Sequence, residues 1–114
     1  MSALHARARH TEHRGARLLG TTRRIRKSLF ESASDLETAT LPNGVKVVGE
    51  VKNRARVPAI VTSALEQAED YAAPDEVAVG IIAKKGSREL IVVMRGDVFR
   101  QIAGLGDAQE DLCR

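Results

Sequence analysis

The sequence predicts an α/β fold in which helices flank a mixed sheet, and three observations support this prediction. Residues 1–20 are rich in Ala, Leu and Arg, which predicts a helix that ends at Gly20. Residues 35–52 read as a hairpin around the turn sequence Pro42-Asn43-Gly44. The pattern of residues 58–103 predicts a helix, a hairpin of two apolar strands and a short closing helix.

Composition predicts a single soluble domain over residues 1–103 and a flexible tail over 104–114. Cys113 is the only cysteine, which excludes a disulfide within the chain and indicates a reducing compartment. No apolar run reaches the length of a membrane span, and the N-terminus lacks the apolar part of a secretory signal. We therefore expect no membrane partner and a cytoplasmic protein, or one of the host cytoplasm if a phage encodes it.

Charge is unevenly distributed along the chain. Residues 1–34 carry eight Lys/Arg against two Glu, whereas residues 35–114 carry ten Lys/Arg against thirteen Asp/Glu. A basic first third indicates either an arm that faces phosphate groups or a solvated helix, and charge alone leaves both open. Aromatic residues are scarce, so stacking on bases is not expected as the main mode of nucleic-acid binding.

The basic segment 21–34 follows the helix of residues 1–20. This segment is either a short strand followed by a Ser-rich loop or a mobile basic linker. Its cluster Arg23-Arg24-Ile25-Arg26-Lys27 is the densest candidate for phosphate binding in the chain. His5, His10 and His13 do not share one helical face well, so we expect them to be exposed to solvent rather than to bind a metal.

The hairpin of residues 35–52 carries the strongest chemical signal. Its second strand, Val45 to Lys52, places Glu50 and Lys52 on one face about 7 Å apart. If the hairpin closes at the turn, Asp35 returns to the same end, and two carboxylates meet one ammonium group. Such oxygen ligands suit Mg²⁺ or Mn²⁺, and an adjacent lysine suits a phosphate or a metal-bound water. The alternative is a surface ion pair between Glu50 and Lys52.

The second half of the chain predicts three further elements. Pro58 begins a helix that ends before Pro74, with Gln67 and Tyr71 as neighbours on one face. Residues 77–83 and 89–94 predict two buried strands that pair antiparallel across a basic turn. Asp97 is a candidate N-cap for the closing helix.

These residues resemble the PD-(D/E)XK nuclease superfamily, most closely the archaeal-type Holliday junction resolvases and RecB-like nuclease domains. Asp35 followed by Glu50-Val51-Lys52 resembles the D…ExK signature, with Ser34 where that pattern often has proline. Gln67 to Tyr71 matches the QxxxY element of RecB-like nucleases, and Glu12 resembles a glutamate of the first helix near the metal site. For Glu12 the alternative is a pair with a neighbouring arginine. The order of the elements is a further match.

The resemblance implies a restriction-endonuclease-like αβββαβ core and an Mg²⁺- or Mn²⁺-dependent DNA endonuclease. It implies that Asp35, Glu50 and the Val51 carbonyl bind the metal with Glu12 as a further ligand, while Lys52 acts on the attacking water and Gln67 positions substrate. Candidate DNA contacts are Arg14, Arg23, Arg24, Arg26, Lys27, Ser32, Ser34, Arg54, Arg56 and Tyr71.

For substrate, the resemblance implies branched DNA, most concretely a four-way junction cut by a two-fold homodimer. A flap or nicking nuclease with the same site is one alternative, and a DNA-binding module without catalysis is another. A dimeric interaction protein would show no salt-dependent affinity for DNA. The sequence contains no GxSxG, glycine-rich phosphate loop or HExxH, so it offers no competing catalytic motif.

Overall fold

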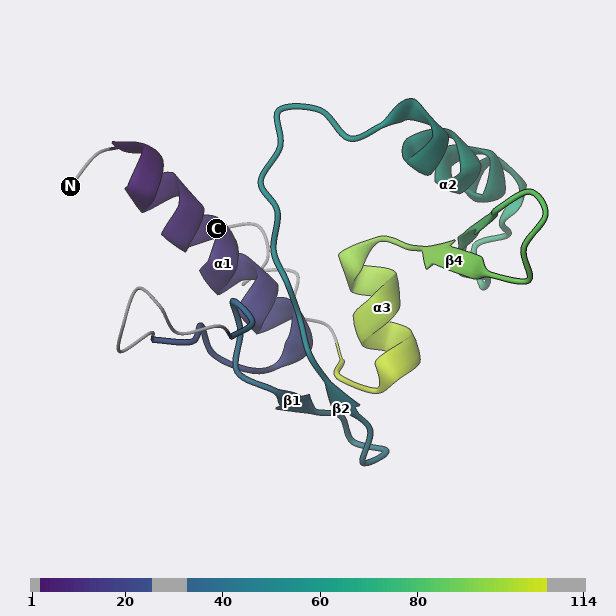
Figure 1. Ribbon diagram of the computed structural model, residues 1–114. Coiled ribbons are helices and arrows are strands. Elements are labelled where there is room, and N and C mark those ends of the chain that lie inside the picture. Colours follow the sequence, from purple (N-terminus) through teal and green to yellow (C-terminus); the bar gives the residue numbers. More distant parts are fainter. Residues whose placement is uncertain (1–2, 26–32, 107–114) are drawn as a thin grey trace. The chain divides into compact units, whose positions relative to one another are not determined.

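The computed structural model describes residues 3–25 and 33–106, which form three helices and two antiparallel hairpins (Figure 1). The chain divides into two compact units. Residues 1–53 and 100–114 belong to the first unit, and residues 54–99 to the second unit. The predicted α/β class is confirmed, because helices and sheets both occur. Both sheets of the described residues are two-stranded and antiparallel, and the αβββαβ core stays a prediction.

In the first unit, α1 (Ala3–Leu19) ends where the sequence predicted. Gly20 adopts a φ of 75°, the Gly20 N–H donates to the Arg17 carbonyl and the Thr21 N–H donates to the Ala16 carbonyl. This pattern is a Schellman motif, for which glycine is the favoured residue. The Arg100 guanidinium also donates to the carbonyls of Arg17 and Leu18, at 2.7 and 3.0 Å. These bonds satisfy carbonyls that the helix end leaves without partners.

The first hairpin pairs β1 (Ala39–Thr40) with β2 (Lys46–Val47). Gly44 donates its N–H to the Leu41 carbonyl at 2.8 Å and has a φ of 88°, and Asn43 has a negative φ. The turn is therefore of type I with a left-handed glycine, whereas an Asn-Gly sequence often forms turns in which both residues have positive φ. The Asn43 side chain accepts the Val45 N–H and holds the turn.

The predicted strand over residues 45–52 is too long. The β1–β2 ladder contains only the pairs Ala39 with Val47 and Thr40 with Lys46. Near Asp35, hydrogen bonds to side chains take the place of backbone pairing. The Asp35 N–H donates to the Glu50 carboxylate rather than to a backbone carbonyl of the facing segment. Glu50, Val51 and Lys52 therefore lie beyond β2 in an extended segment.

Two glycines let this extended segment approach α1 closely. A Cβ on Gly15 would lie 2.7 Å from Cγ2 of Val51, and a Cβ on Gly49 would lie 2.8 Å from Cδ1 of Leu19. Leu36, only 1 % exposed, packs beside both glycines. The apolar core of the first unit thus lies directly beneath the segment that carries Glu50.

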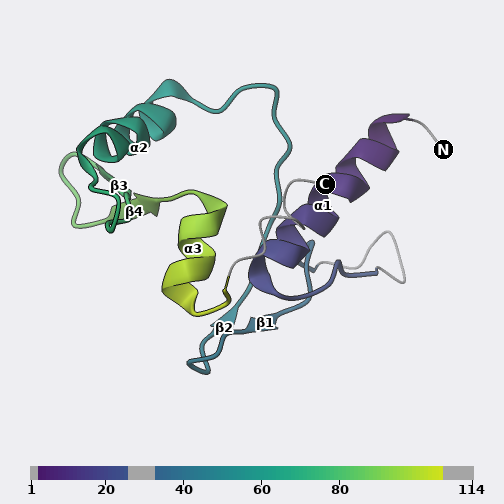
Figure 2. The ribbon, with the colours of Figure 1, turned by 180° about the vertical axis from the view of Figure 1, so that it is seen from behind.

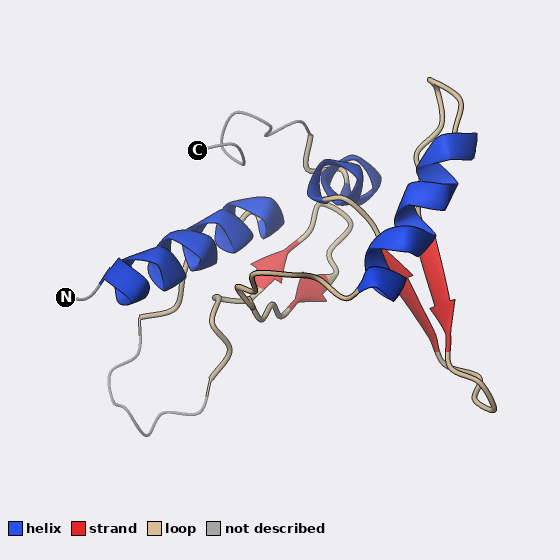
Figure 3. Cartoon of the chain, turned by 90° about the horizontal axis from the view of Figure 1, so that it is seen from above, coloured by secondary structure: helices blue, strands red, loops and turns tan. Residues whose placement is uncertain are grey.

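The second unit places α2 (Ala59–Tyr71) against the hairpin of β3 (Gly80–Ala83) and β4 (Leu90–Val93). Figures 2 and 3 show the helix beside the two strands. The strands pair antiparallel, as predicted, and their register runs from Gly80 with Val93 to Ala83 with Leu90. They are shorter than the predicted strands 77–83 and 89–94. Gly80 allows the close approach, because a Cβ there would lie 3.0 Å from the backbone nitrogen of Leu65.

The prediction that both strands of this hairpin are buried is wrong. Gly80 faces α2, so Ile81 and its partner Val92 project from the opposite face, where they are 58 % and 54 % exposed. The reason is that α2 covers one face and packs mainly on β3, so Ile91 of β4, which shares the face of Gly80, is also 61 % exposed. Beyond β4, α3 begins at Gly96 and runs to Ala103, which puts Asp97 in its first turn rather than at the N-cap. No helix of the described residues is long and apolar enough to cross a membrane.

Candidate functional site

Asp35 lies between two backbone segments of the first unit. On one side, Arg23 and Leu36 form an isolated antiparallel bridge. The Arg24 N–H donates to the Asp35 carbonyl at 2.9 Å, and the Glu37 N–H donates to the Thr22 carbonyl at 2.9 Å. Residues 21–34 were predicted to form either a short strand with a loop or a basic linker. This bridge favours the short strand, at the start of the segment.

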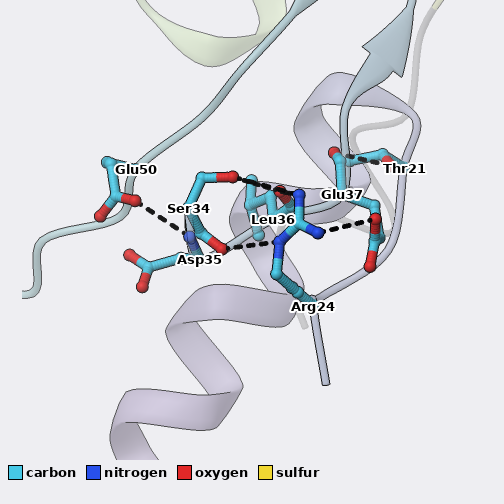
Figure 4. Close-up of polar contacts among 7 residues, drawn as sticks. All are labelled: Thr21, Arg24, Ser34, Asp35, Leu36, Glu37 and Glu50. Atoms are coloured by element: carbon cyan, nitrogen blue, oxygen red, sulfur yellow. Dashed lines mark hydrogen bonds and ion pairs between the residues drawn. The ribbon is translucent and has the colours of Figure 1, made fainter. Parts of the chain in front are cut away.

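On the other side, Asp35 is joined to the segment of Glu50 and Val51 by two hydrogen bonds in opposite directions. The Asp35 N–H donates to Oε1 of Glu50 at 3.0 Å (Figure 4). The Val51 N–H in turn donates to Oδ2 of Asp35 at 2.9 Å. Each acid thus accepts a backbone N–H from the segment of the other, so the two predicted site residues Asp35 and Glu50 lie together.

Glu12 approaches the same place from α1. Its carboxylate accepts a hydrogen bond from Nε of Arg23, with which it forms an ion pair. Glu12, Arg23 and Asp35 line a hollow of about 270 Å³, together with Arg24 and Ile25. The predicted first-helix glutamate therefore lines the same hollow as Asp35, and it also has the arginine partner that was its alternative.

Arg24 points away from Glu12 into a second polar group. Its Nε donates to the Ser34 carbonyl at 3.1 Å, and one terminal nitrogen lies 3.4 Å from both Oγ of Ser34 and the Leu36 carbonyl. The other terminal nitrogen pairs with the Glu37 carboxylate at 3.4 Å. Adjacent residues of an extended segment point to opposite sides, which explains why Arg23 and Arg24 reach different partners.

Lys52 is exposed at the end of the extended segment. Among the ion pairs of the described residues, none joins Glu50 to Lys52, because Glu50 turns toward the Asp35 backbone. The ion pair that was the alternative for these two residues is therefore not formed in this structure. The Lys52 ammonium remains accessible to an anionic ligand.

The acids of the site provide hard oxygen donors, which is the chemistry that Mg²⁺ requires. Within residues 3–25 and 33–106, however, no three His, Cys, Asp or Glu side chains converge closely enough to hold a metal ion. Glu12 is engaged by Arg23, and Asp35 and Glu50 each accept a backbone amide. Asp35 and Glu50 thus fit such an ion by the chemistry of their oxygens and lie on segments in hydrogen-bond contact, and the Glu12 carboxylate is directed to an arginine.

The other predicted residues are distributed over the chain. Arg14 and Ser34 belong to the first unit, where Ser34 hydrogen bonds to Arg24 and the side chain of Arg14 is exposed, as are His10 and His13. The second unit contains Gln67 and Tyr71 on α2, with Arg54 and Arg56 before it, all four exposed. The following lie outside the described residues: Arg26, Lys27, Ser32 and Cys113.

Sequence reasoning missed Glu37 and Thr21. Glu37 pairs with Arg24, and its carbonyl accepts the Thr21 hydroxyl at 3.0 Å. The position of Glu37 was a usable signal, because two residues after Asp35 is the same face of an extended chain. No local pattern indicated that Arg24 would be its partner.

A scan against protein-family models and searches of curated proteins and of solved structures found no match to this chain.

Proposed function

We propose that the chain is a metal-dependent DNA endonuclease. The observation that supports this most directly is the pair of hydrogen bonds between Asp35 and the segment of Glu50 and Val51. These residues carry the resemblance to the D…ExK signature, and they are 15 and 16 positions apart in the sequence. That they lie in hydrogen-bond contact is what a shared site requires.

The proposed chemistry assigns a role to each side chain. Asp35 and Glu50 would hold Mg²⁺ or Mn²⁺ together with the Val51 carbonyl. When bound, the ion supplies a water of lowered pKa and offsets the charge of the phosphate. Lys52 would orient that water, take its proton, or stabilise the developing negative charge. Glu12 would join the acids once its carboxylate is released from Arg23.

On the DNA side, the basic residues of the first third would contact phosphates without reading sequence. Arg14 and Arg23 are the described candidates near Glu12, and Arg54 and Arg56 are exposed candidates of the second unit. We further propose a two-fold homodimer, because a symmetric pair of sites suits symmetric cuts in a four-way junction.

The test uses the purified full chain on labelled four-way junction, flap and linear duplex DNA, with Mg²⁺ or with EDTA. Asp35→Asn is the inactive variant, and Asp75→Asn, which changes an exposed acid of the second unit, is its matched control. We expect paired nicks in the junction that require Mg²⁺ and Asp35 and are retained in Asp75→Asn. Cleavage of flap or duplex instead would keep the site and change the substrate. Cleavage that persists in Asp35→Asn would refute the assignment.

A DNA-binding module without catalysis is the second candidate, and one observation favours it. No group of three metal-binding side chains forms among the described residues. Such a module would bind junction DNA with an affinity that falls as salt rises and would cut none of the three substrates with Mg²⁺. The same experiment therefore distinguishes it from the nuclease.

A further inference from the structure

Arg24 holds the segment around Asp35 through its main chain and its side chain together. Its N–H donates to the Asp35 carbonyl, and its guanidinium donates to the carbonyls of Ser34 and Leu36, the residues on either side of Asp35. Figure 4 shows this guanidinium between Ser34, Leu36 and Glu37. One arginine thus binds the main-chain carbonyls of Asp35 and of both its neighbours.

All three guanidinium nitrogens of Arg24 take part in these contacts. Nε binds the Ser34 carbonyl, one terminal nitrogen binds Oγ of Ser34 and the Leu36 carbonyl, and the other pairs with Glu37. The Ser34 hydroxyl itself donates to the Leu36 carbonyl at 2.8 Å, which closes the group. A guanidinium presents donors in a fixed planar fork, so it suits several acceptors at once better than an ammonium does.

The position of these contacts connects them to the acids. Arg24 donates to the carbonyl of the peptide between Ser34 and Asp35, and the N–H of this same peptide donates to Glu50. The Asp35 carboxylate in turn accepts the Val51 N–H. A shift of residues 34–36 would therefore move Asp35 relative to Glu50. The Arg24 side chain is also 24 % exposed, and each of its guanidinium nitrogens contacts an acceptor within the first unit.

We propose that Arg24 is a positioning residue for Asp35 rather than a phosphate contact. It fixes the main chain at residues 34–36, so that Asp35 and Glu50 keep the geometry that their joint chemistry needs. The catalytic consequence of this role rests on the proposed nuclease function, whereas the geometric consequence does not. Arg24 holds Asp35 in place whether or not the protein cuts DNA.

The test compares Arg24→Lys, which keeps the charge and loses the fork, with Arg88→Lys, which changes an exposed arginine of the second unit, as a matched control. Amide hydrogen exchange by NMR measures the protection of Asp35 and Val51. Binding to junction DNA at several salt concentrations measures the number of phosphate contacts. Cleavage with Mg²⁺ separates kcat from KM, which shows whether geometry or binding has changed.

In Arg24→Lys we expect the protection of both amides to fall about fivefold or more, as for the loss of one hydrogen bond. We expect kcat to fall by about 10- to 100-fold at nearly constant KM, because misplaced reacting groups lower the rate more than the binding. Unchanged protection of both amides would overturn the proposal. Loss of protection without cleavage by the wild type would support the positioning role and refute the nuclease.

Glu37→Ala keeps the proposal testable if Arg24→Lys does not fold. This exposed substitution removes one guanidinium partner and leaves the others. We expect a smaller loss of amide protection at Asp35 and an unchanged dependence of DNA affinity on salt. The slope of log DNA affinity against log salt concentration could instead become steeper by the amount of about one phosphate contact. That result would mean that the released Arg24 binds phosphate, and it would overturn the proposal.

Discussion

The two hairpins of the chain are held together in different ways. In the first unit, β1 and β2 share only two residue pairs, after which hydrogen bonds from side chains to the backbone connect Asp35 with Glu50 and Val51. In the second unit, β3 and β4 share four residue pairs, and α2 packs on one face. The first hairpin depends on particular side chains, and the second depends on a regular ladder.

This difference bears on where function is located. A backbone ladder forms with many sequences, because its hydrogen bonds come from main-chain groups. The contacts around Asp35 require a carboxylate, an arginine and a serine at defined places, which leaves little freedom of substitution. Polar groups concentrated in an irregular segment are typical of binding and catalytic sites that a more regular scaffold supports.

The largest expected effect comes from a substitution that breaks the polar contacts of the first hairpin. Under the proposed function, Glu50→Ala removes a carboxylate that would hold the metal, whose contribution is several kcal/mol of transition-state stabilisation. We expect Mg²⁺-dependent cleavage to fall about 1000-fold or more, with helix content by circular dichroism retained. The matched change Glu66→Ala, at an exposed residue of α2, should leave cleavage intact. Equal rates for Glu50→Ala and wild type would remove Glu50 from the site.

The next effect concerns the core beneath those contacts. Leu36 is 1 % exposed, whereas Leu90 of β4 is 64 % exposed. Leu36→Ala should lower the free energy of unfolding by about 2–5 kcal/mol, and Leu90→Ala should change it by less than about 0.5 kcal/mol. Urea unfolding followed by circular dichroism measures both. Similar losses for the two variants would mean that the face bearing Leu90 is covered in solution.

A smaller effect tests the close approach at Gly15. Alanine favours helix by up to about 1 kcal/mol over glycine. Its Cβ would, however, lie 2.7 Å from Cγ2 of Val51, and overpacking of that kind typically costs about 1–3 kcal/mol. We expect Gly15→Ala to be destabilising on its own. The double variant Gly15→Ala/Val51→Ala should be more stable than the sum of the single changes predicts. Simple additivity in this cycle would show that the two side chains do not compete for space.

The smallest effect belongs to the second unit. The hydrogen bond from Arg95 holds the pKa of the exposed Glu69 below its usual value. The unfolded chain then binds the proton more readily than the folded chain does, so this pair stabilises above the usual pKa of 4.5 and its contribution is lost as the pH falls through the lowered pKa. Thermal unfolding at a series of acidic pH values should show a slightly weaker pH dependence in Glu69→Gln. An identical profile would mean that the pair is not formed in solution.

Local sequence patterns predicted the elements whose signals are local. The end of α1 at Gly20, the turn at Asn43 and the helix after Pro58 follow from backbone preferences of single residues, and the structure has all three. The meeting of Asp35 with Glu50 follows from hairpin closure and was also predicted.

Other features depend on partners far away in the sequence. The length of the β1–β2 ladder could not be predicted, because the Glu50 carboxylate takes an N–H that a ladder would otherwise use. The partners of Arg24 lie 10 to 13 residues away, and no periodic pattern indicates such a contact. Apolar runs predicted buried strands at 77–83 and 89–94, yet a run cannot indicate how much of a sheet a helix covers.

The contact of Arg100 with the end of α1 has a consequence for the order in which the chain folds. Arg100 is 83 positions from Arg17 and 82 from Leu18, so the first unit is built from two stretches of the chain that are far apart in sequence. α2 and the β3–β4 hairpin pack together within residues 59–93, which precede Arg100 in the chain. The end of α1 must wait for Arg100, and closing so long a loop costs entropy that a contiguous unit avoids. We therefore expect α2 and the β3–β4 hairpin to form faster than the contact of Arg100 with the end of α1.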